Sequence, residues 1–174
     1  MTAFEIPTVE TARLRLRAFR AADLDAYAAM QANPAVMRYL LTGQTANRVQ
    51  VWYTMLASLG SWGLRGYGMW ACEEIASGHF IGSIGIFEPL DWPEPEIAYS
   101  LDRPFWGQGF ATRGRGCGAR LALRACPAHP AASFIRPENQ ASIRVAERLG
   151  AILEGTTELR GVAFQHWVHH RPAA

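Results

Sequence analysis

Cysteine is scarce in this sequence, and its pattern excludes two ways of stabilising a small domain. Three cysteines occur among 174 residues, Cys72, Cys117 and Cys126, an odd number without CxxC spacing. This pattern provides neither a disulfide framework nor a zinc site. Because disulfides form in oxidising compartments, we expect a protein of a reducing compartment.

Long apolar runs and a strong charge of one sign are also missing. No segment approaches the roughly 18 apolar residues of a membrane span, and the first ten residues, MTAFEIPTVE, contain no apolar core of a signal peptide. All 17 basic residues are arginines, but the formal net charge is only +2, too small to require nucleic acid or an anionic membrane as a partner. We expect a cytoplasmic protein with no nucleic-acid or membrane partner.

The composition fits a globular chain with a real core. Hydrophobic residues make up 49% and charged residues 18%, which argues against disorder. A length of 174 residues suits one domain spanning residues 1–174, and no repeat or linker divides it.

The first sixty residues predict a strand followed by two helices. Leucines alternate with arginines in TARLRLRAFR, which predicts a half-buried strand over 11–20. A helix is predicted over 22–33, ended by Pro34. A second is predicted over 45–60, followed by a loop over 60–68. Its apolar face is expected to contain Val49, Trp52, Tyr53 and Leu56.

The rest of the chain alternates strands and helices in the order of a mixed α+β sheet, not a doubly wound parallel one. A short turn near 76–78 predicts an antiparallel hairpin between two of the strands. The prolines of PLDWPEP, residues 89–95, predict a loop. The predicted strands are 67–74, 79–88, 96–101 and 132–136, the predicted helices are 119–125 and 139–149, and a closing hairpin joins 156–162 to 164–170.

The stretch WGQGFA, residues 106–111, lies between a predicted strand and a predicted helix. Glycines let backbone N–H groups approach an anion, and a helix N-terminus adds roughly half a positive charge. The loop therefore favours a pyrophosphate or similar group, although a plain tight turn has the same pattern. The Walker A motif is absent, and the Rossmann motif would need glycine in place of Thr112.

A second informative stretch is PENQASIRVAERLGA, residues 137–151. It predicts an amphipathic helix with Asn139 as N-cap and Ile143, Val145 and Leu149 among its buried positions. Gly150 is expected to end the helix in the left-handed conformation.

Together these segments resemble the GNAT acyltransferase superfamily, and within it the RimJ/RimL-like enzymes that acetylate protein N-termini. TARLRLRAFRAADLDAY is similar to their first strand and helix, and IGSIGIFEPLDWPEPEIAYSLDRPFWGQGFAT to their central strands and acetyl-CoA loop. ENQASIRVAERLGA is similar to the segment after their fifth strand. The family motif falls on Trp106, Gly109 and Ala111, with tryptophan in place of the general Arg or Gln, as in many Rim-type members.

The resemblance implies one N-acetyltransferase domain with a mostly antiparallel central sheet, two splayed parallel strands and flanking helices. Acetyl-CoA would be the cosubstrate, with its pantetheine between strands 98–101 and 133–136. A primary amine would attack the thioester directly in a ternary complex, and a backbone N–H near Tyr99 or Ser100 would stabilise the developing oxyanion. The residues predicted to bind acetyl-CoA are Ser100, Leu101, Trp106, Gly107, Gln108, Gly109, Phe110, Ala111, Thr112, Asn139 and Ser142.

Glu96 is the predicted general base, acting alone or through a water. It begins the strand beside the glycine loop, where family members often carry a carboxylate. Glu88 and Asp91 on the preceding loop are alternatives, and a solvated glutamate at a strand end is the structural alternative.

Ser142 is the predicted acid. Many members protonate the departing thiolate with a tyrosine four residues before the helix-ending glycine, but that position here is Ala146. Ser142 would take this role, and Asn139 would bond the pantetheine or a water. A plain helix-surface serine remains the alternative for Ser142.

The acceptor is expected to be a small-molecule amine or a protein N-terminus, and homodimers are common in such families. Three histidines near the C-terminus do not predict a metal site, since His166 and His170 lie about 13 Å apart on a strand at ~3.3 Å per residue. Cys117 is expected to be a bystander thiol. The aromatic candidates for the amine pocket are Trp52, Tyr53, Trp62, Tyr67, Trp92 and Phe164.

The segment after the glycine loop is unusual for the family. Its three glycines at alternate positions would cost a helix roughly 2–3 kcal/mol relative to alanine. Arg113, Arg120 and Arg124 would share one helical face and pair with phosphates or an acidic partner. Alternatively, two compensating frameshifts in a GC-rich gene have altered residues 113–132.

Two other functions compete with acetyl transfer. The first is a non-catalytic CoA- or peptide-binding module on the same fold. The second is a basic interaction domain that binds an acidic partner through its arginines, with strong salt dependence.

Overall fold

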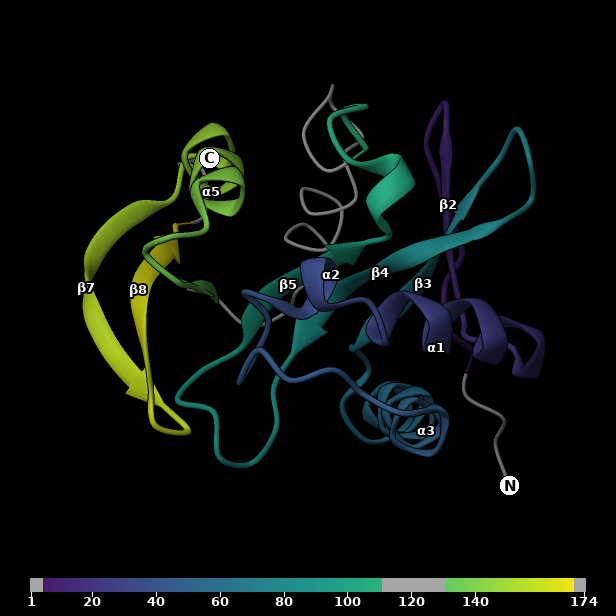
Figure 1. Ribbon diagram of the computed structural model, residues 1–174, viewed down its shortest axis with the longest axis horizontal. Coiled ribbons are helices and arrows are strands. Elements are labelled where there is room, and N and C mark those ends of the chain that lie inside the picture. The colour runs from purple at the N-terminus through teal and green to yellow at the C-terminus, as the bar shows by residue number, and fades with distance from the viewer. Residues whose placement is uncertain (1–4, 111–130, 171–174) are drawn as a thin grey trace.

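The computed structural model describes residues 5–110 and 131–170, which form an eight-stranded sheet flanked by helices (Figure 1). The strand order is β1-β2-β3-β4-β5-β6-β8-β7, and neighbouring strands are antiparallel except β5 and β6. This confirms the mixed, mostly antiparallel α+β architecture. The helix predicted over 119–125 lies outside the described residues, as do Ala111, Thr112 and Cys117.

The first five strands form a continuous antiparallel array. They are β1 (Val9–Glu10), β2 (Leu14–Arg17), β3 (Met69–Glu74), β4 (Phe80–Phe87) and β5 (Glu96–Leu101). The turn between β3 and β4 contains Gly78 at φ +70°, a conformation that glycine adopts without steric cost. The hairpin predicted near 76–78 is confirmed. The strand predicted over 11–20 is shorter, because the chain enters a 3-10 turn, η1 (Ala21–Asp23).

Helices α1 (Leu24–Gln31), α2 (Pro34–Met37) and α3 (Arg48–Arg65) follow β2 and lie on one side of the sheet (Figure 1). Pro34 does end α1, but it also begins α2, since a proline is well suited to the first turn of a helix. The side chain of Asn33 caps α2 by accepting from the Ala35 N–H.

The loop predicted over 60–68 is wrong for its first six residues. Helix α3 continues through Gly60 and ends at Gly66, which has φ +75°. Trp62 anchors this last part of the helix to β3, because its side chain is buried and its indole N–H donates to the carbonyl of Met69.

The apolar face predicted for this helix does not pack against the core. Val49, Tyr53 and Leu56 are 63%, 65% and 43% exposed. The helix packs on the sheet through a different stripe, with Val51 and Met55 fully buried. Both stripes are apolar, so periodicity alone did not distinguish the side that meets the sheet.

The second part of the sheet contains β6 (Ala131–Ile135), β7 (Ile152–Leu159) and β8 (Val162–His169), with α5 (Gln140–Leu149) after β6. Asn139 caps α5 and Gly150 ends it at φ +83°, as predicted. The closing hairpin turns at Arg160 and Gly161, both with positive φ. It begins earlier than predicted, at Ile152, and β7 is an exposed edge strand.

Strands β5 and β6 run parallel but separate almost at once. Glu96 and Ala132 are their only registered pair, and the two halves of the sheet diverge beyond it (Figure 1). The hydroxyl of Ser133 donates to the carbonyl of Ile97 at 3.0 Å, which satisfies one backbone group at the start of the gap. The predicted splay of two parallel strands is confirmed.

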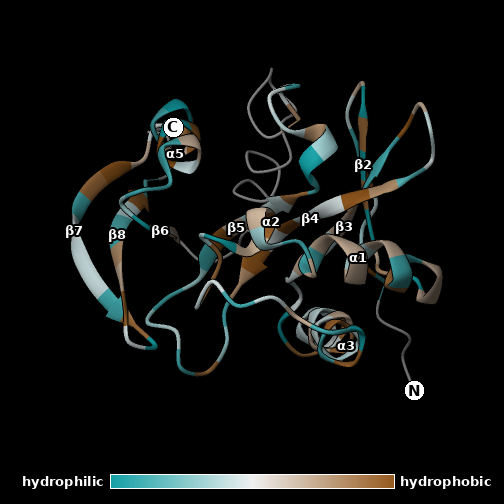
Figure 2. Ribbon diagram, viewed as in Figure 1, coloured by the Kyte–Doolittle hydropathy of each residue, from teal (hydrophilic) through white to brown (hydrophobic). Residues whose placement is uncertain are grey.

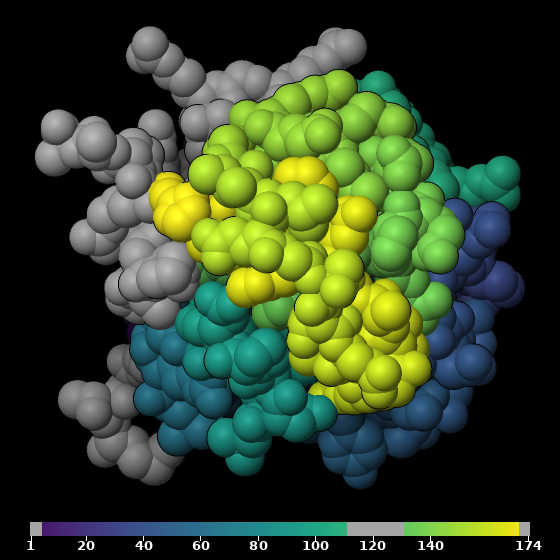
Figure 3. Space-filling view, turned by 90° about the vertical axis from the view of Figure 1, so that its left-hand side faces the viewer, coloured from purple at the N-terminus to yellow at the C-terminus, as the bar shows by residue number. Residues whose placement is uncertain are grey.

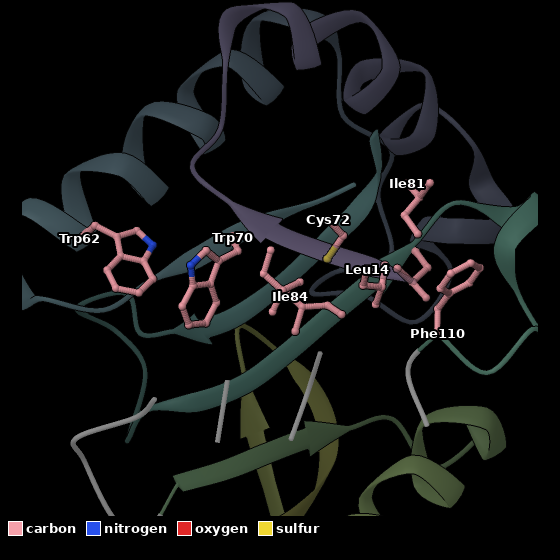
Figure 4. Packing of buried hydrophobic residues seen from close by; sticks show 9 residues of the cluster. Leu14, Trp62, Trp70, Cys72, Ile81, Ile84 and Phe110 are labelled. Carbon is pink, nitrogen blue, oxygen red and sulfur yellow. The ribbon is translucent and has the colours of Figure 1, made fainter. Parts of the chain in front are cut away.

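The core lies on both faces of the sheet. Hydrophobic residues colour much of the central strands, and the loops around them are largely hydrophilic (Figure 2). One buried cluster joins β2, β3 and β4 to the glycine loop, with Leu14, Trp70, Ile84 and Phe110 among its members (Figure 4). Cys72 belongs to this cluster, and burial raises the pKa of its thiol.

A buried ionic cluster ties β2 and β3 to the first helix. Arg17 is 4% exposed and donates to Glu73 at 2.6 Å and to both oxygens of Asp23 at 2.8 Å. Asp23 and Glu73 are each 5% exposed. Arg17 therefore bridges two buried carboxylates. Glu73 also pairs with Arg15 at 2.5 Å, whereas Arg17 is the only cationic side chain paired with Asp23 among the described residues, so removing Arg17 leaves Asp23 buried without a cationic partner.

We predict that Arg17→Met lowers the free energy of unfolding by about 3–5 kcal/mol, because breaking a buried ion pair leaves an uncompensated charge. Urea denaturation measures the change. Arg48→Met, which removes an exposed pair with Asp25, is the control and should leave the transition midpoint nearly unchanged. Equal midpoints for the two variants would contradict a structural role for the buried cluster.

Candidate active site

The start of the gap between β5 and β6 opens into a cavity of about 440 Å³. Strand β5 alternates its side chains, so Glu96, Ala98 and Ser100 share the face that borders the cavity. Four residues predicted for catalysis or acetyl-CoA binding line it together, from strand β5 and from the N-terminal end of α5. They are Glu96, Ser100, Asn139 and Ser142.

Glu96 is held at the point where the strands separate. One carboxylate oxygen accepts from the indole N–H of Trp92 at 2.8 Å, and the other accepts from the backbone N–H of Phe134 at 3.3 Å. Burial raises the pKa of Glu96 to about 8, while these two hydrogen bonds oppose the rise. The carboxyl group therefore exchanges its proton near neutral pH, as a general base requires.

The alternative bases are both engaged in ion pairs. Glu88 accepts from Arg65 and from the hydroxyl of Tyr67. Asp91 is exposed and accepts from Arg160 at 2.7 and 2.9 Å, which lowers the pKa of its carboxyl group. Among the three candidates, only Glu96 lines the cavity without a cationic partner.

Asn139 and Ser142 lie across the gap from β5. The side-chain oxygen of Asn139 accepts from the Ser142 N–H at 3.2 Å, which caps α5. The hydroxyl of Tyr99 donates to the Ser142 carbonyl at 3.2 Å, so β5 is joined to α5 across the separated strands. The capping bond fixes the start of α5 beside the cavity.

A chain of hydroxyl groups forms part of the cavity wall. Ser100 contacts Ser83 at 3.2 Å, and Ser83 contacts the hydroxyl of Tyr27 at 3.3 Å. All three residues line the cavity. Burial raises the pKa of Tyr27, so the chain is uncharged at neutral pH.

The glycine loop lies beyond the end of β5 and does not line this cavity. Gly107 and Gly109 have φ of +71° and +81°, the left-handed conformation that lets a loop present its backbone. Arg13, directly before β2, fixes the loop by donating to the Gln108 carbonyl at 2.9 Å. The predicted binding residues in this loop thus lie outside the set of residues that line the cavity.

The side chains in and beside this loop differ in burial. Phe110 is 4% exposed in the core, and the Arg13 guanidinium stacks over its ring. Leu101 is 8% exposed. Trp106 is 48% exposed, and its indole N–H donates to the Leu101 carbonyl at 2.6 Å. The side chains of Phe110 and Leu101 therefore belong to the core, whereas the side chain of Trp106 is partly open to solvent.

The aromatic candidates for the amine pocket separate into two groups. Trp92 and Phe164 line the cavity. Trp62 and Tyr67 pack elsewhere in the core, and Trp52 and Tyr53 lie on the exposed face of α3.

The histidines are each engaged separately. His166 bonds Glu94 at 2.6 Å, His170 lies 3.3 Å from Glu154, and His169 bonds Ser133 at 3.0 Å. Within residues 5–110 and 131–170, no three metal-ligating side chains come together. No helix in these ranges is long and apolar enough to cross a membrane.

Two contacts of the cavity wall have little or no local sequence signal. Trp92, a predicted pocket aromatic, also donates to Glu96 four residues later, across a turn that contains two prolines. Leu41, after α2, also lines the cavity and has an unusual φ of +44°. Arg136 holds it there by donating to its carbonyl at 2.8 Å, a contact across 95 residues that no local pattern announces.

Known proteins are similar to this chain in sequence. A family model described as an acetyltransferase (GNAT) domain matches residues 13–152. The uncharacterized protein YkkB of Bacillus subtilis (strain 168) is 31% identical over 156 residues, which are 80% of this chain and 82% of that protein.

Solved structures show the same fold. An acetyltransferase from Agrobacterium tumefaciens aligns with a TM-score of 0.82 at 27% identity over 98% of both chains. A RimL ribosomal L7/L12 α-N-protein acetyltransferase, solved with coenzyme A, aligns with a TM-score of 0.73 at 22% identity, covering 94% of this chain and 98% of its own. The family model covers most of the sequence and confirms the resemblance found in its motifs. The chain therefore belongs to the GNAT acetyltransferase family.

Proposed function

We propose that the protein is an N-acetyltransferase that moves the acetyl group of acetyl-CoA to a primary amine, with Glu96 as the general base. The observation that carries this proposal is the position of Glu96: a carboxylate with a raised pKa at the point where β5 and β6 separate, beside a cavity large enough for an amine. Family membership supplies the acetyl-transfer chemistry.

The chain offers two places that suit acetyl-CoA. Backbone N–H groups around Gly107 and Gly109 suit a pyrophosphate, and a Cβ built on Gly107 meets nothing within 4 Å, so the loop is open on that side. The pantetheine arm fits as an extra strand along β5, whose ladder with β6 ends after Glu96.

The reaction needs two proton transfers. The acceptor nitrogen attacks the acetyl carbonyl carbon in the ternary complex, and Glu96 takes up the proton that this nitrogen loses. For an alkylamine the proton leaves the ammonium group before attack, and for an amine that is already neutral it leaves the nitrogen as that atom becomes positively charged. A C–N bond forms, the C–S bond breaks, and the thiolate leaves. The Ser142 hydroxyl then supplies a proton to the sulfur and is reprotonated from solvent. Asn139 supports Ser142 by fixing the first turn of α5.

We predict that Glu96→Gln lowers kcat/KM by roughly 10²–10⁴, the usual contribution of a general base. It should leave acetyl-CoA affinity almost unchanged, because the carboxyl group faces the amine. In wild type, kcat/KM should rise with pH and level off above about 8, where Glu96 is ionised. Thiol release measures both effects with an arylamine acceptor, whose own pKa lies below this range.

Glu94→Gln is the matched control, since Glu94 lies two residues away and pairs with His166 outside the cavity. A Glu96→Gln enzyme that keeps full activity and the inflection near pH 8 would overturn the assigned base. Intact acetyl-CoA binding without transfer to any amine would favour a non-catalytic CoA-binding module.

The raised pKa of Glu96 also predicts a pH-dependent stability. Between pH 4.5 and about 8 the folded state keeps a proton that the unfolded chain loses, so this group destabilises the fold progressively as pH rises through that window. The melting temperature of Glu96→Gln relative to wild type should therefore increase from pH 6 to pH 9. A difference that stays constant with pH would show that Glu96 titrates normally.

The glycine loop predicts a test of acetyl-CoA binding. Acetyl-CoA at 100 times its dissociation constant should stabilise wild type by about 2.7 kcal/mol, or very roughly 5–10 °C. Gly107→Asp adds a negative charge at φ +71°, in a conformation that Asp tolerates. It should weaken acetyl-CoA binding about tenfold or more through charge repulsion.

Gly78→Asp is the control, because Gly78 has φ +70° and also has nothing near its Cβ. The measurement is the shift in melting temperature that acetyl-CoA causes in each of the two variants. Equal shifts in the two variants would mean that the loop does not hold the pyrophosphate.

A further inference from the structure

The cavity beside Glu96 has an apolar wall that the transfer chemistry does not require. Residues of the α2–α3 loop, the β4–β5 region and β8 meet there, although they come from distant parts of the sequence. The β4–β5 loop also lies beside the tip of the β7–β8 hairpin (Figure 3), where Arg160 bonds Asp91. The apolar wall contains Met37, Leu40, Leu41, Phe87, Trp92 and Phe164.

Apart from Glu96, the described charged side chains that line the cavity are already paired with opposite charges. Glu88 is paired with Arg65, and its carboxylate also accepts from Tyr67. Arg160 is paired with Asp91 through two hydrogen bonds and stacks over Trp92. Among the described residues of the cavity wall, Glu96 is the one carboxylate without a cationic partner.

This arrangement accommodates one positive charge. The ammonium group of an acceptor meets Glu96, but a second ammonium group farther along the cavity would lose water without gaining a free carboxylate. Burying a charge without a partner is unfavourable, whereas an apolar or aromatic body gains from contact with the wall.

The size of the cavity limits the acceptor as well. Its volume of about 440 Å³ lies near the lower end of the range for small-molecule sites. Part of that volume borders Ser100, Asn139 and Ser142, where the thioester must lie. The remainder suits a body of small-molecule size.

We propose that the acceptor is a small primary amine with a single positive charge on an apolar, ring-bearing body, and not a polyamine, an aminoglycoside or a protein N-terminus. This inference rests on the proposed acetyl transfer at Glu96 and narrows its substrate class. Trp92 and Phe164 contact the body of the amine, and the Arg65–Glu88 pair keeps that end of the cavity neutral.

Three acceptors test the proposed limit of one positive charge and the preference for a ring. Hexylamine and 1,6-diaminohexane have the same length and differ by one ammonium group, while 2-phenylethylamine adds a ring. We expect kcat/KM for hexylamine to exceed that for the diamine by about tenfold or more, and 2-phenylethylamine to be the best of the three. Thiol release and product mass measure transfer, and because the chain has no lysine, acetylation of lysines in the enzyme cannot add to the signal.

Arg65→Gln tests the reason for this preference. It frees the Glu88 carboxylate, so the ratio of hexylamine to diamine kcat/KM should fall by about threefold or more. Arg48→Gln is the matched control, since it removes an ion-paired arginine from the other end of the same helix. If Arg65→Gln is unstable, Ala57→Glu places a carboxylate at an exposed position of the cavity rim and should change the ratio in the same direction.

The outcomes separate this inference from the proposed function. Preference for the diamine, for spermidine, for an aminoglycoside or for a lysine-free peptide N-terminus would overturn the acceptor class and leave acetyl transfer standing. No transfer to any amine would overturn the acceptor class as well. In that case, a melting temperature raised by acetyl-CoA would show that the protein still binds the cosubstrate. An unchanged melting temperature would overturn the proposed function too.

Discussion

The separation of β5 from β6 is the constraint on which the rest of the site depends. Two parallel strands share one registered pair, Glu96 and Ala132, and then diverge. Backbone groups that would otherwise form a ladder must find other partners, and the Ser133 hydroxyl supplies one for Ile97. The gap leaves an edge of β5 open to a ligand and places a carboxylate where the gap begins.

Side-chain contacts fix the position of the two halves of the sheet relative to each other. Tyr99 reaches from β5 to α5, and Arg160 joins the β7–β8 hairpin to the loop before β5. Trp92 comes from that same loop and donates to Glu96. The contacts that fix the geometry of the gap are therefore the contacts that set the charge and shape of the cavity, which links the proposed acceptor preference to the fold.

Several parts of the site could be predicted from short stretches of sequence. Asn139 and Gly150 marked the ends of α5, and Glu96 followed a proline-rich loop at the start of a strand. Such signals depend on neighbours a few residues apart, where capping and strand alternation act. The face of α3 that packs on the sheet was not predictable in this way, because both of its stripes are apolar and only the sheet selects between them.

The sequence by itself determined the family, the secondary structure around the gap and the identity of its candidate base, because motifs and periodicities are local properties. Only the tertiary structure decided the environment of that base. The raised pKa of Glu96 follows from burial beside Trp92 and the Phe134 N–H. The ion pair between Glu88 and Arg65 and the hydrogen bond from Arg136 to the Leu41 carbonyl likewise join segments that are far apart in the chain. Desolvation and long-range ion pairing arise when such segments pack together, so no stretch of sequence specifies them alone.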